Sequence, residues 1–111
     1  MRRDADRAGA VFDALSDPTR RAILAAVADS PAVTATELAT GLPISRQAVV
    51  KHLTALTDAG LLDRERSGRE VRYRMTPAPL SDAVSWMAEV GGQWDARLAS
   101  LGRQMKNRGQ A

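Results

Sequence analysis

A polar cluster opens the helix that the sequence predicts over residues 46–59. Ser45 precedes this helix as an N-cap, and Arg46 and Gln47 occupy its first turn. Arginine can pair bidentately with guanine O6 and N7, and glutamine with adenine N6 and N7. A serine beside a helix N-terminus can hold a phosphate. The candidate DNA contacts on and beside this helix are Ser45, Arg46, Gln47, Val50, Lys51 and Thr54.

A run of arginines follows in residues 61–75. Alternating apolar residues predict two strands there, 61–66 and 70–75, joined by a turn at Ser67-Gly68-Arg69. The segment holds five arginines against Asp63, Glu65 and Glu70, so it carries +2 of the chain's net charge of +3. A basic hairpin beside a base-reading helix suits the DNA backbone or the minor groove. The candidate hairpin contacts are Arg64, Arg66, Arg69 and Arg72.

Both features have a plain structural alternative. The helix could be an ordinary amphipathic helix with a solvated polar face. Arginines of the hairpin could pair across the strands with Glu65 and Glu70. His52, at the edge of the buried face, is by type more often a hydrogen-bonded structural residue than a ligand, and its outer nitrogen could also meet a phosphate.

Local signals set the elements that position these side chains. A capping box at Thr34-Ala35-Thr36-Glu37 predicts a short helix over 35–40, with Gly41 as its left-handed cap. Gly60 ends the next helix, so residues 35–59 form a helix-turn-helix and 61–75 its wing. Upstream, helices are expected over 5–15 and 18–29, the second capped by Asp17. The fold class is mainly α with a β-hairpin: a winged helix-turn-helix.

The C-terminal segment, 78–106, carries apolar residues at alternating spacings of three and four. This seam is typical of a helix that packs along another helix, and it consists of Val84, Met87, Gly91, Trp94, Leu98, Leu101 and Met105. At 1.5 Å per residue the helix would be about 44 Å long, longer than so small a domain is wide. We therefore expect part of its apolar face to meet a second chain. Gly91-Gly92 weakens the helix and could bend it.

Composition excludes several classes of function. With no Cys and one His among 111 residues, thiol chemistry is absent and a metal site has almost no ligands. None of the usual nucleotide-binding or hydrolase motifs occurs, so we expect no enzyme and no cofactor. The longest apolar run, Ala22–Ala28, is far too short for a membrane span, and the N-terminus lacks a hydrophobic signal core. One cytoplasmic domain over 1–111 is expected.

Four segments in order resemble the ArsR-type (arsenical-resistance repressor) winged-helix family. They are residues 12–24, 44–53, 59–62 and 69–73, with sequences FDALSDPTRRAIL, ISRQAVVKHL, AGLL and REVRY. The resemblance implies a homodimeric bacterial or archaeal regulator that represses by binding an inverted repeat at its own promoter. It also implies a dimer interface built from the first and last helices. The interface residues expected on this basis are Val11, Phe12, Val84, Met87, Trp94, Leu98 and Leu101.

The chain departs from the metal-sensing members of that family. Those members carry Cys-Val-Cys-Asp-Leu where this chain has Thr34-Ala35-Thr36-Glu37-Leu38, and Thr replaces both sulfur ligands. We therefore expect no metal response through cysteines. Two alternatives stay open: a winged-helix module that binds a protein partner, and a repressor that answers to an unknown small molecule in a pocket at the dimer seam near Gly91-Gly92.

Overall fold

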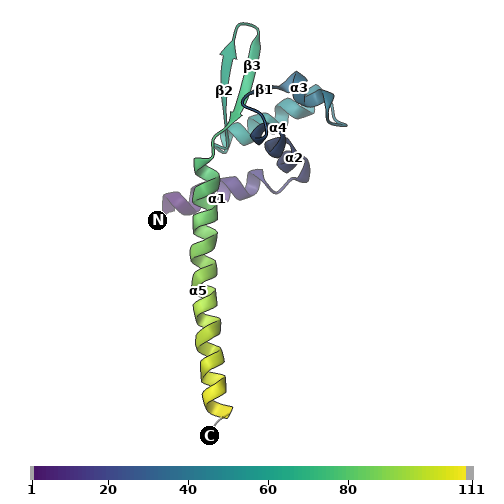
Figure 1. Cartoon of the computed structure of the whole chain (residues 1–111). Coiled ribbons are helices and arrows are strands. Elements are labelled where there is room, and N and C mark those ends of the chain that lie inside the picture. The colour runs from purple at the N-terminus through teal and green to yellow at the C-terminus, as the bar shows by residue number, and fades with distance from the viewer. Residues whose placement is uncertain (1, 110–111) are drawn as a thin grey trace.

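The protein folds into a small helical body with a hairpin at one end and a long helix that runs away from it (Figure 1). The computed structural model describes the backbone of residues 2–109 and the side chains of residues 7–106. The elements are α1 (Arg2–Ala14), α2 (Pro18–Ala28), β1 (Val33–Thr34), α3 (Ala35–Thr40), α4 (Arg46–Asp58), β2 (Leu62–Ser67), β3 (Glu70–Met75) and α5 (Ala78–Gly109). The molecule measures 75 × 30 × 20 Å, and α5 accounts for the long dimension.

Three helix starts are fixed by the side chains that the sequence indicates. Asp17 accepts hydrogen bonds from the backbone N–H groups of Thr19 and Arg20 at 2.8 and 3.1 Å. Thr34 and Glu37 form the complete capping box of α3. Ser45 accepts from the backbone N–H of Ala48 at 3.1 Å, which begins α4. Each cap satisfies backbone donors that the first turn of a helix leaves free.

The glycines differ in what they do. Gly60, at φ +80°, ends α4 in a conformation that side chains disfavour, and Gly68, at φ +63°, turns the hairpin. The expectation of a left-handed cap at Gly41 is wrong, because its φ is −100°. Its backbone N–H instead bonds to Leu38 O at 3.2 Å, closing the last turn of α3 without a positive φ.

The hairpin belongs to a three-stranded antiparallel sheet in the order β1-β3-β2. The third strand, β1, was not expected from the sequence. It has only two residues, and it pairs Val33 with Tyr73 and Thr34 with Arg72, partners forty and thirty-eight positions away. This strand joins the wing to the start of α3 and so fixes how the wing sits against the helix-turn-helix.

The core lies between α2, α4 and the sheet. Ile23, Val27, Val49, Leu53 and Leu56 have no exposed surface, and around them pack buried side chains from α1, α3 and the strands. Along α4 the buried residues recur at three- and four-residue intervals, so one face of this helix is committed to the core and the other is left to solvent.

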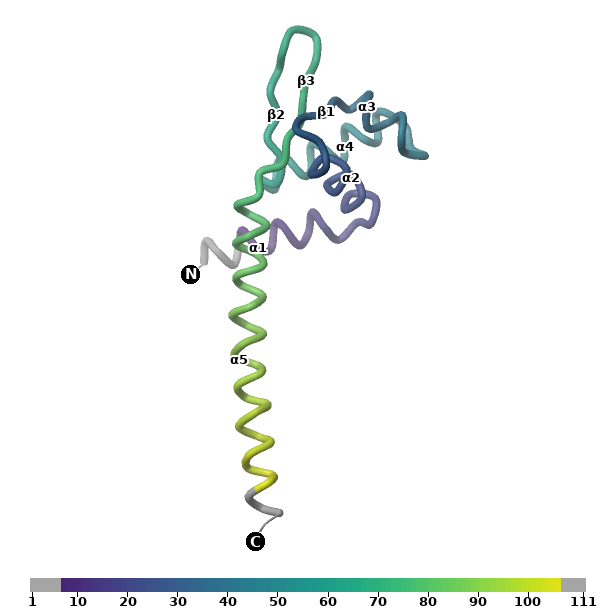
Figure 2. The backbone as a smooth tube through the Cα atoms, viewed as in Figure 1, coloured from purple at the N-terminus to yellow at the C-terminus, as the bar shows by residue number. Residues whose placement is uncertain are grey.

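Helix α5 is continuous from Ala78 to Gly109, through Gly91 and Gly92, so the two glycines do not break it. It extends a few residues beyond the expected end at 106. Near its beginning α5 crosses α1 (Figure 2), and Ala83 of α5 is buried in the core. Beyond Ala83 its described side chains are exposed. Within the described residues, no helix is both long enough and apolar enough to cross a membrane.

Candidate nucleic-acid interface

The first turn of α4 presents the polar side chains expected there. Ser45, Arg46, Gln47 and Lys51 are exposed, and Thr54 is half-buried. Val50 is also half-buried and packs on the edge of the core. The same helix buries Val49, Leu53 and Leu56, so its orientation is held by the core while its N-terminal turn projects into solvent.

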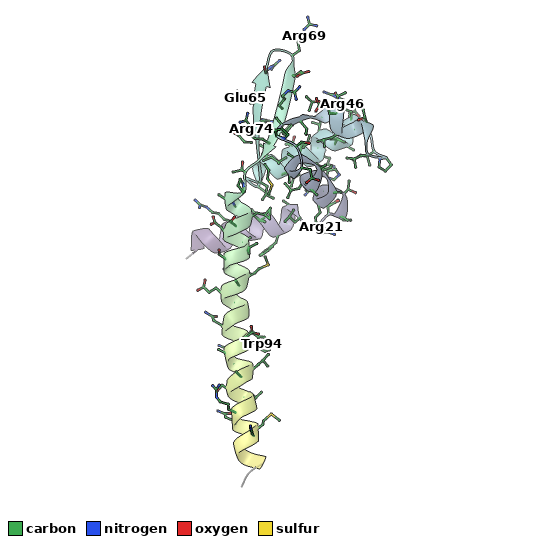
Figure 3. All side chains as sticks on the ribbon, in the orientation of Figure 1. Arg21, Arg46, Glu65, Arg69, Arg74 and Trp94 are labelled. Carbon is green, nitrogen blue, oxygen red and sulfur yellow. The ribbon has the colours of Figure 1, made fainter. Side chains whose placement is uncertain are left out.

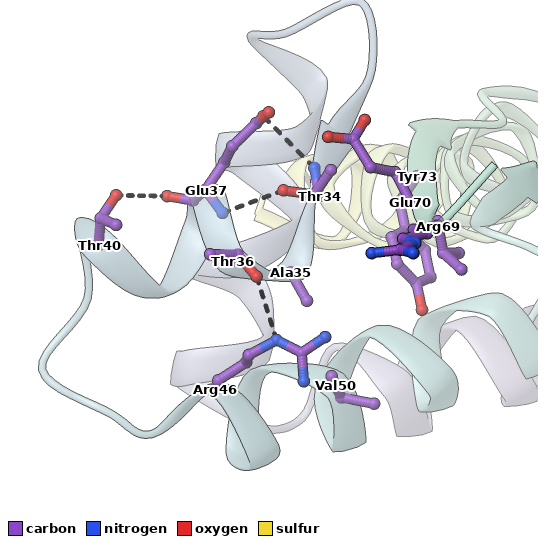
Figure 4. Close-up of a pocket in the computed structure, with 11 residues that line it drawn as sticks. Thr34, Ala35, Thr36, Glu37, Thr40, Arg46, Val50, Arg69, Glu70 and Tyr73 are labelled. Carbon is purple, nitrogen blue, oxygen red and sulfur yellow. Dashed lines mark hydrogen bonds between the residues drawn. The ribbon is translucent and has the colours of Figure 1, made fainter. Parts of the chain in front are cut away.

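Arg46 makes one contact that sequence reasoning missed. Its Nε donates a hydrogen bond to Thr36 Oγ1 at 3.1 Å, linking the start of α4 to α3 (Figure 4). The bond uses one of the five N–H donors of the guanidinium and leaves both terminal nitrogens available. Since the link restricts the side chain, the guanidinium is positioned before any ligand arrives.

Part of the hairpin charge is neutralised within the fold. Arg74 forms an ion pair with Glu65 across the strands, and Figure 3 labels both residues on the hairpin. Arg72 lies 2.9 Å from Glu70 and 3.5 Å from Glu37 of α3. The cross-strand pairing considered above therefore occurs for Arg74, whereas Arg72 pairs with Glu70 on its own strand and with Glu37 of α3. Arg72, a candidate DNA contact, ties the wing to α3 of the helix-turn-helix through Glu37.

Three exposed arginines keep their charge available. Arg64, Arg66 and Arg69 form no ion pair with any part of the chain that the structure describes. Glu65 and Glu70 are neutralised by Arg74 and Arg72. The three remaining arginines and Asp63 then give the hairpin a net charge of about +2, which equals the charge of the whole segment. The free positive charge is thus concentrated in β2 and at the tip, where Arg69 projects from the hairpin (Figure 3).

The register shows which way two of these arginines face. Arg64 lies opposite Tyr73, and Arg66 lies opposite Val71. Directly opposed residues in an antiparallel pair share one face of the sheet. Tyr73 is only 5% exposed and belongs to the core, so this face is turned toward the helical body. Arg64 and Arg66 therefore extend the same side of the molecule as α4.

His52 takes the structural role. Its Nδ1 accepts a hydrogen bond from Arg20 Nε at 3.3 Å, which links α4 to α2. Nearby, hydrogen bonds from the backbone N–H groups of Arg20 and Thr19 lower the pKa of Asp17, and the positive charge of Arg20 adds to this effect. In the described residues no group of three or more His, Cys, Asp or Glu side chains could hold a metal ion.

The expected interface residues divide into two groups. Val11 is 1% exposed within a single chain and packs in the core, so it has almost no surface to offer a partner. Phe12, one position later, is 37% exposed, and its ring centroid lies 5.8 Å from that of Trp86. Along α5 the large apolar side chains are 40–66% exposed: Val84, Trp86, Met87, Val90, Trp94, Leu98, Leu101 and Met105. The sequence seam omitted Trp86 and Val90, which widen the stripe.

Comparison with known proteins finds helix-turn-helix regulators of transcription, in agreement with the exposed helix α4 and the hairpin beside it. A helix-turn-helix domain family matches residues 15–65. The transcriptional repressor SdpR of Bacillus subtilis is 35% identical over 88 residues, which cover 79% of this chain and 97% of that protein. The structure of an ArsR-like transcriptional regulator from Rhodococcus sp. RHA1 is similar at 42% identity and a TM-score of 0.79, covering 87% of this chain and 91% of that one.

A third similar protein is the homodimeric winged helix-turn-helix DNA-binding domain from Mycobacterium bovis. It shares 25% identity at a TM-score of 0.61, over 82% of this chain and 81% of that one. The chain belongs to the ArsR-type family of winged helix-turn-helix transcriptional regulators. It is a DNA-binding regulator of transcription, and its family consists of regulators and not of enzymes. The resemblance noted in the sequence is confirmed, as is the fold class.

Proposed function

We propose that the protein is a homodimeric repressor that binds an inverted-repeat operator, its own promoter included, in the cytoplasm. The observation that carries the proposal is the uncovered apolar stripe of α5, from Val84 to Met105, on a chain that also exposes a base-reading helix. A stripe of this size on a soluble domain marks an interaction surface. Two copies related by a two-fold axis read a two-fold related DNA site.

The proposed contacts to DNA divide by chemistry. Gln47 and Lys51, exposed on α4, face base edges in the major groove, with Arg46 held beside them by Thr36. Ser45 and Thr54 lie at the flanks of this face and suit phosphate contacts. Arg64, Arg66 and Arg69 contact the neighbouring backbone or minor groove, because their charge is not neutralised by the fold. Arg72 is left out of this set on account of its two carboxylate partners.

Charge favours an antiparallel arrangement of the two α5 helices. Residues 78–95 contain Asp82, Glu89 and Asp95 and no Lys or Arg, a charge of −3. Residues 96–106 contain Arg97, Arg103 and Lys106 and no Asp or Glu, a charge of +3. Parallel helices would place like charges together over their whole length, whereas antiparallel helices bring opposite halves side by side.

The sizes of the seam residues favour one antiparallel register. It sets Val84 opposite Leu101 of the second copy, Met87 opposite Leu98, and Gly91 opposite Trp94. A Cβ added at Gly91 would meet nothing in the single chain within 4 Å, so no contact inside the chain requires a glycine there. In this register the glycine leaves room for the largest side chain of the seam. The two copies of residue 78 would lie about 44 Å apart along the axis, of the same order as one turn of DNA.

Footprinting of the DNA upstream of the protein's own coding sequence tests the operator. The proposal predicts a protected segment with two-fold related halves, about one helical turn apart. A duplex that keeps only one half should lose most of the affinity. Protection of a single, asymmetric half-site with unchanged affinity would contradict the dimeric reading of the operator.

Disulfide trapping tests the register, because the chain has no cysteine of its own. The double variant Val84→Cys/Leu101→Cys should form a covalent dimer on mild oxidation, while each single variant should stay monomeric on a non-reducing gel. In a parallel dimer each single cysteine would face its own copy, so the single variants would form covalent dimers as well. The matched control is Ala96→Cys, which lies on the opposite side of α5 from Trp94.

A further inference from the structure

A groove of about 670 Å³ lies between the wing and the helix-turn-helix (Figure 4). Its volume falls within the range of about 300–1,000 Å³ typical of small-molecule sites. Three threonines, Thr34, Thr36 and Thr40, supply hydroxyls from the side of α3. Val50 of α4 and Val71 of β3 supply an apolar wall. The groove thus combines an apolar surface with several polar groups.

One hydroxyl that lines this groove has no hydrogen-bond partner within the part of the chain that the structure describes. Tyr73 is 5% exposed, and its hydroxyl points into the groove toward α4 (Figure 4). Among the residues that the structure describes, every fully enclosed polar side-chain atom has a hydrogen-bond partner. The Tyr73 hydroxyl forms no hydrogen bond within this same part of the chain, so it opens into the groove. Because the hydroxyl oxygen is open to solvent, a ligand in the groove can replace water as its hydrogen-bond partner.

The charges around the groove favour an anionic ligand. Arg46 keeps its terminal nitrogens free after its bond to Thr36, and Arg69 lies at the rim. The two carboxylates of the lining, Glu37 and Glu70, both pair with Arg72 just outside it. Three arginines against two glutamates leave a net charge of +1. Because Arg46 offers only donors and the Tyr73 hydroxyl can also donate, the matching group is an oxyanion.

We propose that this groove binds a small organic anion: a carboxylate or phosphate ester whose apolar part rests on Val50 and Val71. The oxyanion accepts hydrogen bonds from Arg46 and Tyr73. Since Arg46 and Arg69 also belong to the proposed DNA-binding surface, the bound anion excludes DNA and relieves repression. This second part rests on the proposed function, whereas binding of the anion does not.

Binding is tested on the DNA-free protein with phenyl phosphate, which joins a ring to an oxyanion. Tyr73 is the only tyrosine of the chain, so its ring resonances in an NMR spectrum report on this groove alone. Phenyl phosphate at millimolar concentration should shift these resonances and saturate, whereas benzyl alcohol, which lacks the charge, should not. Unchanged Tyr73 resonances with phenyl phosphate would overturn the proposal.

The variant Tyr73→Phe keeps the ring in the core and removes the hydroxyl. It should weaken phenyl phosphate binding, measured by calorimetry, about tenfold or more, the loss expected for one hydrogen bond to a charged group. Arg46→Gln, on the exposed surface, should do the same if Tyr73→Phe proves unstable. The control Arg7→Gln removes an exposed arginine outside the groove and should bind normally. If all three variants bound phenyl phosphate as tightly as the wild type, the ligand would bind elsewhere, and the proposed groove site would be refuted.

A competition measurement separates the site from its effect on DNA. Phenyl phosphate should raise the protein concentration needed to bind upstream DNA, and Tyr73→Phe should blunt this response. If the ligand binds in the groove but DNA binding is unaffected, the exclusion of DNA is refuted while the site stands. If the protein binds no DNA at all, the proposed function fails, and the NMR titration still decides the ligand site.

Discussion

Replacing Trp94 with glutamate should separate the dimer without unfolding the protein. Trp94 lies in the exposed part of α5 with 59% of its surface open. A tryptophan can bury about 150–250 Å², so about 90–150 Å² remains for a partner to cover. At about 25 cal/mol per Å², this surface contributes about 2–4 kcal/mol for each copy, or about 4–7 kcal/mol for a symmetric dimer.

The dissociation constant of the dimer should therefore rise about a thousandfold or more in Trp94→Glu. Sedimentation velocity over a range of protein concentrations measures this constant directly. Thermal unfolding of the monomer should barely change, because Trp94 lies far from the core. The control Ala96→Glu introduces the same charge on the opposite side of the helix and should leave the dimer intact. A Trp94→Glu protein that dimerises within threefold of wild type, or an equal effect of Ala96→Glu, would refute the role of the stripe.

Four further changes test other parts of the structure. Gln47→Ala should reduce the free-energy preference for operator over random DNA by about 1–3 kcal/mol. Arg69→Ala should weaken binding to operator and to random DNA equally, and it should lower the salt slope by about one for each bound chain. Anisotropy titrations on the two kinds of DNA distinguish these effects. Leu53→Ala, at a fully buried site, should cost about 2–5 kcal/mol of unfolding free energy in urea. The pKa of Asp17 is lowered in the folded state, so its stabilisation is present above its ordinary value of 3.8 and lost as pH falls through the lower folded pKa. Asp17→Asn should therefore flatten the acid limb of a stability–pH curve, and an unchanged limb would argue against this cap.

Local chemistry made much of the fold predictable. The capping box at Thr34 and Glu37 and the caps at Asp17 and Ser45 depend on residues within three positions of each other, so the sequence displays them directly. The alternating pattern of the wing is also local. Strand β1 is not, because two residues carry no readable pattern and acquire their conformation by pairing with β3.

The site was predictable in its residue types but not in its pairings. Sequence places Arg46 at the start of a helix, yet its bond to Thr36 depends on how α3 packs against α4. Arg66 and Arg72 were both candidate DNA contacts in the sequence, and only the fold brings Glu37 beside Arg72. Val11 and Phe12 are neighbours in one apolar pattern, and only the packing of α1 decides which of them is buried.

Fluorescence anisotropy on the protein's own upstream DNA tests the central claim most directly. A scrambled duplex of the same length serves as the reference, and both are measured from about 50 to 200 mM salt. Three unpaired wing arginines in each of two copies make at least six phosphate contacts, which predicts about a thousandfold loss of affinity across this range. The upstream DNA should bind about a thousandfold or more tighter than the scrambled duplex at fixed salt. Equal affinity for both duplexes, or a salt slope near zero, would contradict a repressor that reads its own promoter.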